Sequence, residues 1–403
     1  MTIYTKSQAP DPDTLVVGVV GAGAMGSGIA QVAAAAGHRV VLGDANPAAV
    51  PKARAGIGKA VARGVEKGRL DQGAADALLG RIADAGDLSG ECHAYAECGL
   101  VIEAVLEDLA VKRALFAGLE QVVRDDCILA TNTSSLSVAA IGGGCARAER
   151  VIGIHFFNPA PLMPLVEIVP AITTSASVVA AATQLVSDWK KTTVAASDSP
   201  GFIVNRIARP FYGEALRMLE EHIADVATID WAMRDVGGFR MGPFELMDFI
   251  GNDVNFAVTT SVFEAFNYDG RYRPAITQRR LVEAGLYGRK RGRGYYDYRD
   301  GALKPEPARD PDLARTIVDR TLAMLVNAAV DAVHMHVASP ADIETAMTKG
   351  VNYPMGLLAW GDAIGPAVIL ARLEALQAEY GEERYRPSPL LRRHVRDGRS
   401  LLA

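Results

Sequence analysis

Residues 15–26, with the sequence LVVGVVGAGAMG, decide the fold of the N-terminal half of this 403-residue chain. The stretch opens with an apolar run of the length typical of a strand buried in a parallel sheet. An alanine-rich segment at residues 24–36 predicts the helix that follows, and HRVVL at residues 38–42 predicts a second strand. A strand, a glycine cluster, a helix and another strand in this order indicate a βαβ unit.

Three glycines in the turn of this unit, Gly21, Gly23 and Gly26, have the GxGxxG spacing. Gly21 permits a tight turn, Gly23 lets the backbone approach a pyrophosphate held at the helix N-terminus, and Gly26 lets the helix pack closely on the strand. Asp44, at the end of the second strand, can accept both hydroxyls of a ribose and would repel a 2′-phosphate, so the pattern favours NAD over NADP. The alternatives are a glycine turn without a ligand, and an Asp44 that only caps a helix starting at Pro47.

Further apolar runs extend the predicted sheet. A helical stretch at residues 47–85 is broken near residues 70–71, and strands are predicted at residues 99–105, 128–130 and 151–155, with extensions at residues 165–169 and 192–196. Alternating strands and helices predict an α/β fold, a Rossmann-type doubly wound parallel sheet. Helical periodicity dominates from Pro200 onward, so two all-α modules are expected to follow the sheet.

The expected domain organisation follows from these changes of pattern. A polar stretch at residues 296–311 has three prolines and no periodicity, which indicates a linker. The predicted segments are a flexible tail at 1–14, an NAD-binding Rossmann domain at 15–198, a helical substrate and dimerisation-type domain at 199–298, a linker at 299–311, and a second, degenerate helical copy at 312–403.

The helical segments on the two sides of the linker resemble copies of one module. Residues 224–233 (ADVATIDWAM) align with residues 338–347 (ASPADIETAM). In the same order, Met241-Gly242 aligns with Met355-Gly356, Asp248 with Asp362, the RYRP of 271–274 with that of 384–387, and Arg279-Arg280 with Arg392-Arg393. A correspondence kept over this length indicates a duplicated module. The alternative is a pair of unrelated helical segments of similar composition.

The bulk composition excludes several functional classes. A formal net charge of −5 argues against nucleic acid as the main partner, because phosphate binders usually carry a basic excess. The four cysteines form no CxxC pair and no metal-ligand spacing with histidine, so we expect free thiols in a reducing cytoplasm and no metal. The N-terminus lacks the apolar core of a secretory signal, and no apolar stretch is long enough to span a bilayer.

A histidine directly follows the strand predicted at residues 151–155. His155 begins the sequence HFFNP at the carboxyl edge of the sheet, where ligands bind in such folds, and Glu167 lies in the next apolar run. A carboxylate that holds an imidazole in one tautomer and stabilises the cation makes a general-base pair. Spacing alone does not pair these two residues, and a single histidine is more often a core or surface residue.

The motifs taken together resemble the 3-hydroxyacyl-CoA dehydrogenase family over nearly the whole chain. The resemblance rests on GAGAMGSGIA (21–30), EAVLEDLAVK (103–112), NTSSL (132–136), HFFNPAPLMPLVEIV (155–169), SPGFIVNR (199–206), MGPFELMDFIG (241–251) and GRKRGRGYYDY (288–298). It implies oxidation of a (3S)-3-hydroxyacyl-CoA by NAD, in β-oxidation or phenylacetate breakdown. The alternatives are a crystallin-like relative that binds NAD without catalysis, and a 3-hydroxy acid dehydrogenase acting on free acids.

The resemblance also implies roles for individual residues. His155 is the base, Glu167 orients it, and Ser134 and Asn205 bind the substrate oxygens, although either of the last two could instead be a polar residue at a helix start. The resemblance further places several residues at the cofactor: Met25, Glu107, Lys112, Asn132, Asn158 and Lys290.

Coenzyme A carries phosphates and therefore needs cations. The candidates are Lys67 and the basic loop with Arg289, Lys290, Arg291 and Arg293. Family members often have a serine one helical stretch before the lysine, and Ala60 stands there in this chain, so one CoA contact is in doubt. The alternatives are a solvated helix face for Lys67 and a glycine-rich surface turn for the loop.

The acyl part of the substrate is left open by the sequence. Short family members favour 3-hydroxybutyryl-CoA, whereas larger members with two helical modules often act on 3-hydroxyadipyl-CoA. A dicarboxylic substrate needs a cation near the end of the acyl chain, and no motif assigns one.

The second helical copy is expected to be structural, because Asp319 stands where the first copy has Asn205. Short members of the family pair through their single module, so a fused second copy would cover that surface within one chain, giving a monomer with an internal pseudo-dimer. A homodimer is the alternative.

Removing residues 312–403 should therefore expose apolar surface and cause aggregation or forced dimerisation. Size-exclusion chromatography with light scattering would measure this, and a soluble, active, monomeric truncated protein would contradict it.

Overall fold

The computed structural model describes residues 15–86 and 92–403; the tail predicted at residues 1–14 lies outside the described residues. The chain divides after Ser199 into two compact units. Among the described helices, none is long and apolar enough to cross a membrane. All four cysteines are free thiols, as the sequence predicts.

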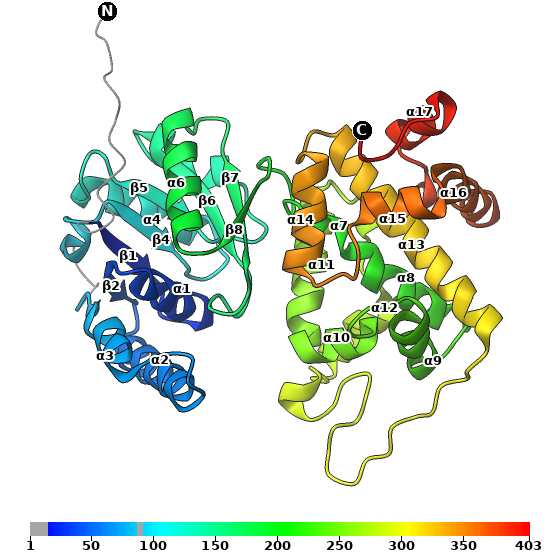
Figure 1. Ribbon diagram of the computed structural model, residues 1–403, viewed down its shortest axis with the longest axis horizontal. Coiled ribbons are helices and arrows are strands. Elements are labelled where there is room, and N and C mark those ends of the chain that lie inside the picture. The colour runs from blue at the N-terminus through cyan, green and yellow to red at the C-terminus, as the bar shows by residue number, and fades with distance from the viewer. Residues whose placement is uncertain (1–14, 87–91) are drawn as a thin grey trace, which may run out of the picture. The chain divides into compact units, whose positions relative to one another are not determined.

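The N-terminal unit is built on an eight-stranded sheet with the order β3-β2-β1-β4-β5-β6-β7-β8 (Figure 1). The strands are β1 (Val16–Val20), β2 (Arg39–Gly43), β3 (Ile82–Asp84), β4 (Leu100–Glu103), β5 (Ile128–Thr131), β6 (Val151–Phe156), β7 (Leu165–Pro170) and β8 (Thr192–Ala195). The order reverses between β1 and β4, and this crossing point is where doubly wound sheets bind nucleotides. The predicted α/β sheet is therefore present.

The prediction of a parallel sheet is wrong at one pair of strands: β6 and β7 run antiparallel. Only residues 157–164 connect them, and a parallel return would need a crossover of a dozen or more residues. The predicted helical stretch at 47–85 also contains a short strand, β3, and its first helix begins at Ala49 rather than Pro47.

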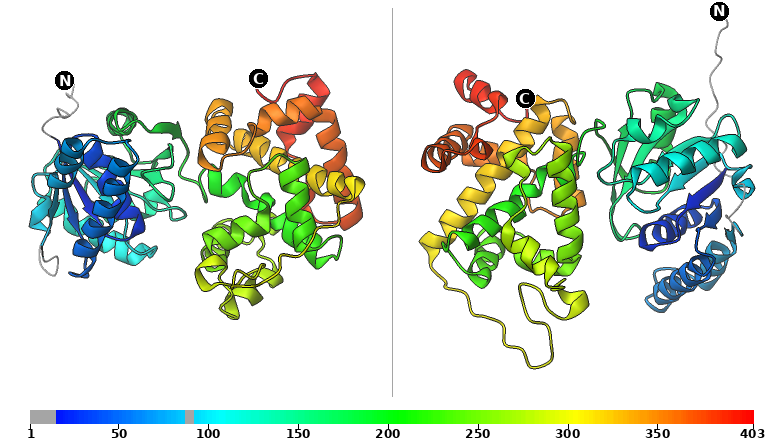
Figure 2. Two further views of the ribbon diagram at one scale, coloured as in Figure 1. Left: turned by 60° about the horizontal axis from the view of Figure 1, so that its bottom comes forward. Right: turned by 180° about the vertical axis from the view of Figure 1, so that it is seen from behind.

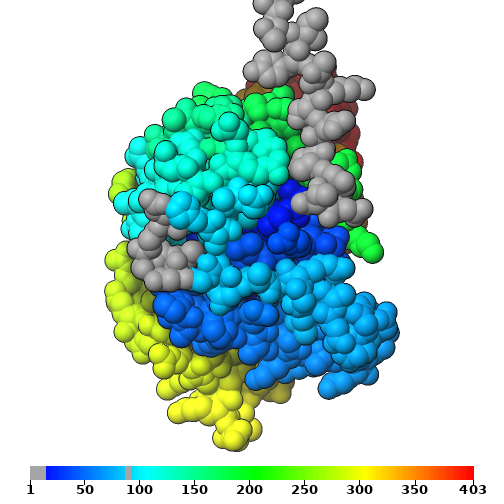
Figure 3. Space-filling model, turned by 90° about the vertical axis from the view of Figure 1, so that its left-hand side faces the viewer, coloured from blue at the N-terminus to red at the C-terminus, as the bar shows by residue number. Residues whose placement is uncertain are grey.

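Helices cover both faces of the sheet. The α-helices of this unit are α1 (Ala24–Ala35), α2 (Ala49–Glu66), α3 (Gln72–Gly80), α4 (Leu109–Val122), α5 (Val138–Gly142) and α6 (Ala176–Asp188), with 3-10 turns η1 (His93–Tyr95) and η2 (Ala148–Arg150). Figure 1 shows α1 and α6 in front of the sheet, and the view from behind in Figure 2 shows α4 on the opposite face. The helices α2 and α3 project beyond the β2 side of the sheet and stand out in Figure 3.

The C-terminal unit is all-helical. Its elements are α7 (Val204–Ile207), α8 (Arg209–Glu220), α9 (Val226–Trp231), the π-helical turn η3 (Ala232–Val236), α10 (Pro243–Ile250), α11 (Asn252–Ala265), η4 (Gly270–Tyr272), α12 (Ile276–Glu283), η5 (Arg289–Arg291), α13 (Pro311–His334), α14 (Pro340–Gly350), α15 (Leu357–Ile364), α16 (Pro366–Tyr380), η6 (Glu383–Tyr385) and α17 (Pro389–Asp397). Residues 302–310, which lie within the linker predicted at residues 299–311, form no helix or strand.

The order of elements repeats across this unit. The series α8, α9, α10, α11, η4, α12 before the linker corresponds to α13, α14, α15, α16, η6, α17 after it. Gly251 and Gly365, which precede α11 and α16, have nearly the same backbone angles, φ 104° and ψ 123° against φ 102° and ψ 119°. The repeated order supports the duplication inferred from the sequence.

Equivalent hydrogen bonds explain why the Met-Gly pairs of the two copies match. Asp230 accepts two backbone N–H hydrogen bonds in the first turn of α10, both of 2.9 Å, and Glu344 does the same for α15 at 2.8 and 3.2 Å. A Cβ atom at Gly242 would lie 2.3 Å from Asp230, and one at Gly356 would lie 1.9 Å from Glu344. Each copy therefore needs glycine beside its capping acid.

Ion pairs join the two copies in both directions. In the first direction, Arg206 and Arg271 of the first copy reach Asp331 on α13, at 3.3 and 3.0 Å. In the second direction, Arg320 and Arg384, which occupy the aligned positions of the second copy, reach Glu214 on α8, at 2.9 and 3.3 Å. Each copy thus contributes two arginines that neutralise a carboxylate on the long helix of the other.

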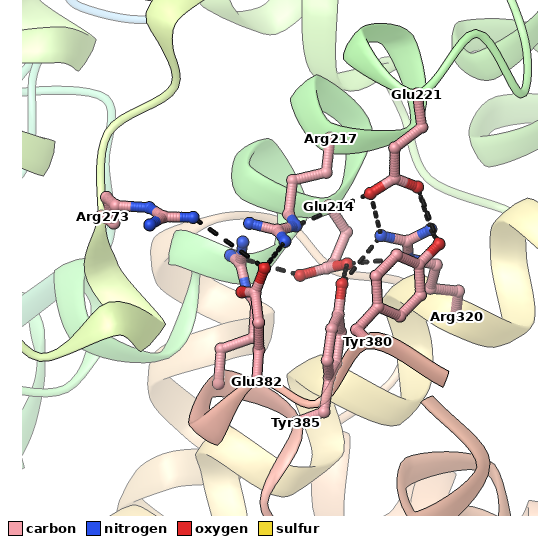
Figure 4. A network of polar contacts seen from close by, with 9 residues as sticks. Glu214, Arg217, Glu221, Arg273, Arg320, Tyr380, Glu382 and Tyr385 are labelled. Atoms are coloured by element: carbon pink, nitrogen blue, oxygen red, sulfur yellow. Dashed lines mark hydrogen bonds and ion pairs between the residues drawn. The ribbon is translucent and has the colours of Figure 1, made fainter. Parts of the chain in front are cut away.

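Figure 4 shows the second of these clusters. The guanidinium of Arg320 lies between Glu214 of α8 and Glu221, the residue directly after α8, and its Nη1 donates to Glu221 Oε2 at 2.8 Å. Two tyrosines close the cluster: Tyr385 OH lies 2.8 Å from Arg320 Nη2, and Tyr380 OH lies 3.0 Å from Nη1. Because Glu214 is fully buried, its charge depends on these partners.

Replacing Arg320 by Met should lower the free energy of unfolding of the helical unit by about 3–5 kcal/mol, because a buried carboxylate loses a partner. Arg315→Met, an exposed arginine on the same helix, is the matched control and should change it by less than about 0.5 kcal/mol. Thermal and denaturant unfolding followed by circular dichroism would measure both; equal effects of the two substitutions would contradict the role of the cluster.

Candidate active site

The structure brings His155 and Glu167 together. They are direct partners in the antiparallel register of β6 and β7, so their side chains leave the sheet on the same face. His155 Nδ1 lies 2.6 Å from Glu167 Oε2. The two residues are 5% and 0% exposed, so water does not screen this contact strongly. The arrangement is an imidazole whose Nδ1 contacts a buried carboxylate.

The residues around His155 connect it to the neighbouring strand. The ring of Phe157 lies 4.6 Å from the imidazole, centre to centre. Asn132, just after β5, accepts a hydrogen bond of 2.8 Å from the backbone N–H of Phe156. This bond ties the carboxyl ends of β5 and β6 to each other at the edge where His155 lies. Asn158 follows on the same connection and is exposed.

Ser134 lies in the loop after β5, and Glu107 holds that loop. One carboxylate oxygen of Glu107 accepts hydrogen bonds from Thr133 Oγ1 at 2.6 Å and from the backbone N–H groups of Ser134 and Ser135 at 3.0 and 3.2 Å. The alternative of Ser134 as a helix cap does not apply, because Ser137 is the N-cap of α5. Ser134 itself is half-buried.

The electrostatics of Glu107 keep its carboxyl ionised. Burial would raise the pKa of this carboxyl, but the charge of Lys112 and the hydrogen bonds from Thr133, Ser135 and Ser134 outweigh burial and hold the pKa below its ordinary value. Glu107 therefore stays an acceptor at neutral pH and fixes the loop that carries Ser134.

Glu103 is a site residue that the sequence reasoning missed. It is fully buried at the end of β4 and accepts hydrogen bonds from Lys112 Nζ at 2.5 Å and Thr131 Oγ1 at 2.7 Å. Lys112 is only 1% exposed, and its Nζ also lies 3.3 Å from Glu107. The described contacts of Lys112 are thus to two acids that support the loop; its predicted contact with the nicotinamide stays a prediction. The signal in the sequence was Glu103 itself, an acidic residue within the apolar run that predicts a buried strand at residues 99–105.

The glycine turn fits a pyrophosphate. Gly21 has φ 102°, and a Cβ atom there would lie 2.5 Å from the carbonyl oxygen of Ala104. A Cβ atom at Gly26 would lie 1.7 Å from the carbonyl oxygen of Gly21. At Gly23, the N-cap of α1, a Cβ atom would meet nothing within 4 Å, so this side of the turn is open to a ligand. The tight turn at Gly21 and the close packing at Gly26 agree with the sequence, and the pyrophosphate contact at Gly23 stays a prediction.

Asp44 is fixed next to this turn. Its Oδ2 accepts a hydrogen bond of 2.7 Å from the backbone N–H of Ala22, and its Oδ1 accepts one of 2.8 Å from Asn46. The alternative of Asp44 as the helix cap is wrong, because α2 begins at Ala49 with Ala48 as its N-cap. The carboxylate instead joins the end of β2 to the glycine turn.

A groove of about 980 Å³ runs from the glycine turn along α1 and α2. Gly23 of the glycine turn and Asp44 beside it line this groove. Pro159 and Leu162, from the connection between β6 and β7, line it as well. Lys52 contributes the one lysine or arginine among its lining residues. Ala60 lines the groove, whereas the predicted Lys67 is exposed at the end of α2 and is not among the lining residues.

The remaining predicted residues belong to the helical unit. Asn205 lies on α7 and is half-buried. In the basic loop, Arg289 pairs with Glu245 at 2.9 Å and Lys290 with Asp253 at 2.6 Å, which reduces the charge these two can offer a phosphate. Arg291 and Arg293 are exposed.

Two family models match the chain. The model described as 3-hydroxyacyl-CoA dehydrogenase, NAD binding domain, matches residues 16–199. The model described as 3-hydroxyacyl-CoA dehydrogenase, C-terminal domain, matches residues 201–298 and again residues 317–401. The second match falls on the region that the sequence predicts to be the second helical copy.

Similar proteins agree with these matches. A 3-hydroxyadipyl-CoA dehydrogenase of Escherichia coli K12 is 40% identical over 94% of this chain and 97% of its own length, and a 3-hydroxybutyryl-CoA dehydrogenase of Bradyrhizobium diazoefficiens is 42% identical over 73% of this chain and 98% of its own. A crystal structure of 3-hydroxybutyryl-CoA dehydrogenase from E. coli K12 superposes with a TM-score of 0.88 at 40% identity, over 95% of this chain and 98% of the other. The chain therefore belongs to the 3-hydroxyacyl-CoA dehydrogenase family, with an N-terminal NAD-binding domain.

Proposed function

We propose that this protein oxidises the 3-hydroxyl of a (3S)-3-hydroxyacyl-CoA to a ketone with NAD, and that His155 is the base. The observation that carries the proposal is the buried contact of 2.6 Å between His155 Nδ1 and Glu167 Oε2. When Nδ1–H donates to the carboxylate, the other ring nitrogen, Nε2, is the proton acceptor. The negative charge of Glu167 stabilises the imidazolium that forms when His155 takes the hydroxyl proton.

The cofactor is held by residues of the N-terminal unit. The N–H groups at the start of α1 and the open side of Gly23 would receive the pyrophosphate, and Asp44 would accept the ribose hydroxyls. NAD, when bound, accepts the hydride from the carbon that carries the hydroxyl. The protein's contribution is to hold base, substrate carbon and cofactor in one geometry, which is worth several kcal/mol of barrier.

Neutral side chains complete the proposed substrate site. Ser134 and Asn205 would bind the substrate oxygens, because a hydroxyl and an amide polarise an oxygen without competing for the proton. The position of Ser134 is supported by the hydrogen bonds that Glu107 makes with its loop. The proposed role of Asn205 is supported by its position in the motif SPGFIVNR at residues 199–206, which this chain shares with the family.

The coenzyme A phosphates would meet exposed cations. In the N-terminal unit these are Lys52, which lines the groove, and Lys67. In the helical unit, Arg291 and Arg293 form no ion pair with the described residues, whereas Arg289 and Lys290 are paired with acids. We propose that the second helical copy has no catalytic role and takes the place of a partner subunit, since each copy neutralises a buried carboxylate of the other.

Replacing His155 by Gln should lower the turnover number by about 100- to 10,000-fold, because the proton acceptor is lost. NADH should still bind, as measured by fluorescence titration, because the glycine turn and Asp44 are unchanged. Glu167→Gln should lower turnover less than His155→Gln, since the base remains but is no longer oriented or stabilised. Stopped-flow absorbance of NADH with acetoacetyl-CoA gives the rates, and near-normal turnover of His155→Gln would show that the base is another residue.

Replacing Asp44 by Ala should raise the Kd for NAD by about 10-fold or more and reduce the preference for NAD over NADP, because the repulsion of a 2′-phosphate disappears. The turnover number at saturating NAD should change much less. Steady-state kinetics with both cofactors would show this, and an unchanged ratio of the kcat/KM values for NAD and NADP would contradict the assignment.

A further inference from the structure

A small pocket within the helical unit is lined by cations. It lies among α8, α11 and α12 and the 3-10 turns η4 and η6, and its volume of about 20 Å³ is slightly more than one ordered water molecule needs. Four arginines are among its lining residues: Arg209, Arg271, Arg273 and Arg384. The pocket therefore suits a small anionic group, such as the end of a chain, rather than a nucleotide.

Three of these arginines have carboxylate partners. The pairs are Arg271 with Asp269 at 2.7 Å and Asp331 at 3.0 Å, Arg384 with Glu214 at 3.3 Å, and Arg273 with Glu382 at 3.9 Å. These contacts belong to the clusters that join the two helical copies. The fourth arginine, Arg209, has no carboxylate partner among the described residues.

Arg209 is buried without an anion. It is 7% exposed and forms no ion pair with any of the residues that the structure describes. Its Nη1 donates to Thr259 Oγ1 at 3.1 Å, its guanidinium lies 5.0 Å from the centre of the Tyr212 ring, and its buried Nε has no hydrogen-bond acceptor. Two neutral side chains do not compensate a buried charge, which costs several kcal/mol when it is unpaired.

The electrostatics of Arg209 differ from those of its neighbour Arg271 in the same pocket. Burial lowers the pKa of Arg209, and the titratable groups that act on it, Tyr212 and Tyr353, are themselves buried, which raises their pKa and keeps them uncharged. Burial also lowers the pKa of Arg271, but the hydrogen bonds and charges of its partners, including Asp269 and Asp331, outweigh burial and raise it. A guanidinium remains protonated in either case. The pocket thus holds a permanent cation whose counter-ion is not part of the described chain.

Arg209 lies close along the chain to a residue of the proposed substrate site. It follows Asn205 by four positions, and only Ala208, whose backbone angles stay in the right-handed helical region, separates the end of α7 from the start of α8. The two residues are therefore about one helical turn apart. The other pocket residues of α8 are Tyr212, Gly213 and Leu216. The pocket therefore begins about one helical turn after Asn205, at the first residue of α8.

The duplicated module shows that the helical fold does not require this arginine. Arg206 aligns with Arg320 in the second copy, and three residues later Arg209 aligns with Ala323, which is fully buried. The arginines that join the two copies are thus present in both modules, whereas Arg209 is present only in the copy that carries Asn205. A charge confined to that copy indicates a role in binding.

We propose that Arg209 binds the distal carboxylate of a dicarboxylic 3-hydroxyacyl-CoA, and so selects an acyl chain of the 3-hydroxyadipyl type over chains that end in a methyl group. This rests on the proposed function, because Asn205 is placed at the substrate by that function. In such a chain three carbon–carbon bonds, about 4 Å, separate the reacting carbon from the terminal carboxyl carbon. A hydrogen bond of about 3 Å from Asn205 to the 3-oxygen and another from Arg209 to the terminal carboxylate add to this length. The total is enough to span one helical turn, about 5.4 Å.

The test compares two substrates that differ only at the end of a six-carbon chain, 3-hydroxyadipyl-CoA and 3-hydroxyhexanoyl-CoA, with the full-length protein and NAD. The measured quantity is the ratio of their kcat/KM values. The wild-type protein should favour the dicarboxylic substrate, and Arg209→Leu should lower the ratio by about 100-fold, the size expected when a buried carboxylate loses its charged partner. Arg209→Lys should keep part of the preference for the dicarboxylic substrate. Lysine retains the positive charge but lacks the pair of N–H groups with which a guanidinium can bind both oxygens of a carboxylate.

Arg315→Leu is the matched control and should leave the ratio unchanged, because Arg315 is exposed on α13 and does not line the pocket. A structural role of Arg209 would lower both kcat/KM values alike, together with the melting temperature, and would overturn the proposal. The pocket could also bind an anion from solution; acetate would then raise the melting temperature of the wild-type protein but not of Arg209→Leu, with the same substrate ratio in both, and this result would also overturn it.

A binding measurement separates this proposal from the proposed function. Adipyl-CoA and hexanoyl-CoA lack the 3-hydroxyl and cannot be oxidised, so calorimetry with these two probes reports recognition of the carboxylate alone. Tighter binding of adipyl-CoA that disappears in Arg209→Leu would support the role of Arg209 even if no turnover were found. Turnover of both hydroxyacyl substrates with equal binding of the two probes would keep the dehydrogenase function and remove the role of Arg209.

Discussion

The antiparallel pairing of β6 with β7 is the constraint on which the proposed chemistry depends. It places His155 opposite Glu167, so the contact of 2.6 Å is built into the register of the sheet rather than left to a flexible loop. A shift of the register by one residue would turn one of the two side chains to the other face. Because the pair is buried, the carboxylate can fix the tautomer of the imidazole without competition from water.

Two further acids of the N-terminal unit have a supporting role. Glu103 and Glu107 share Lys112, and together they fix the loop after β5, which carries Ser134. The same device appears at the cofactor turn, where Asp44 accepts a hydrogen bond from the backbone N–H of Ala22. Preorganised polar groups of this kind need little rearrangement when the substrate and cofactor bind.

The helical unit uses its charges in two ways. Arginines at aligned positions of the two copies neutralise buried carboxylates on opposite long helices, which makes the copies depend on each other. Arg209 departs from this symmetry, since its counterpart is an alanine and no carboxylate in the described part of the chain pairs with it. Symmetric charges therefore stabilise the unit, and the charge without a counterpart remains to recognise a ligand.

The sequence by itself determined the αβ alternation, the glycine turn, the acid after β2 and the duplicated module, because these are local patterns or ordered repeats along the chain. The tertiary structure decided which residues meet. The short connection at residues 157–164 forces β7 to return antiparallel and so pairs His155 with Glu167, while burial reveals Glu103 and distinguishes Arg209 from the paired arginines around it. Contacts between distant segments and the desolvation of a charge depend on the packed chain, and no window of sequence contains them.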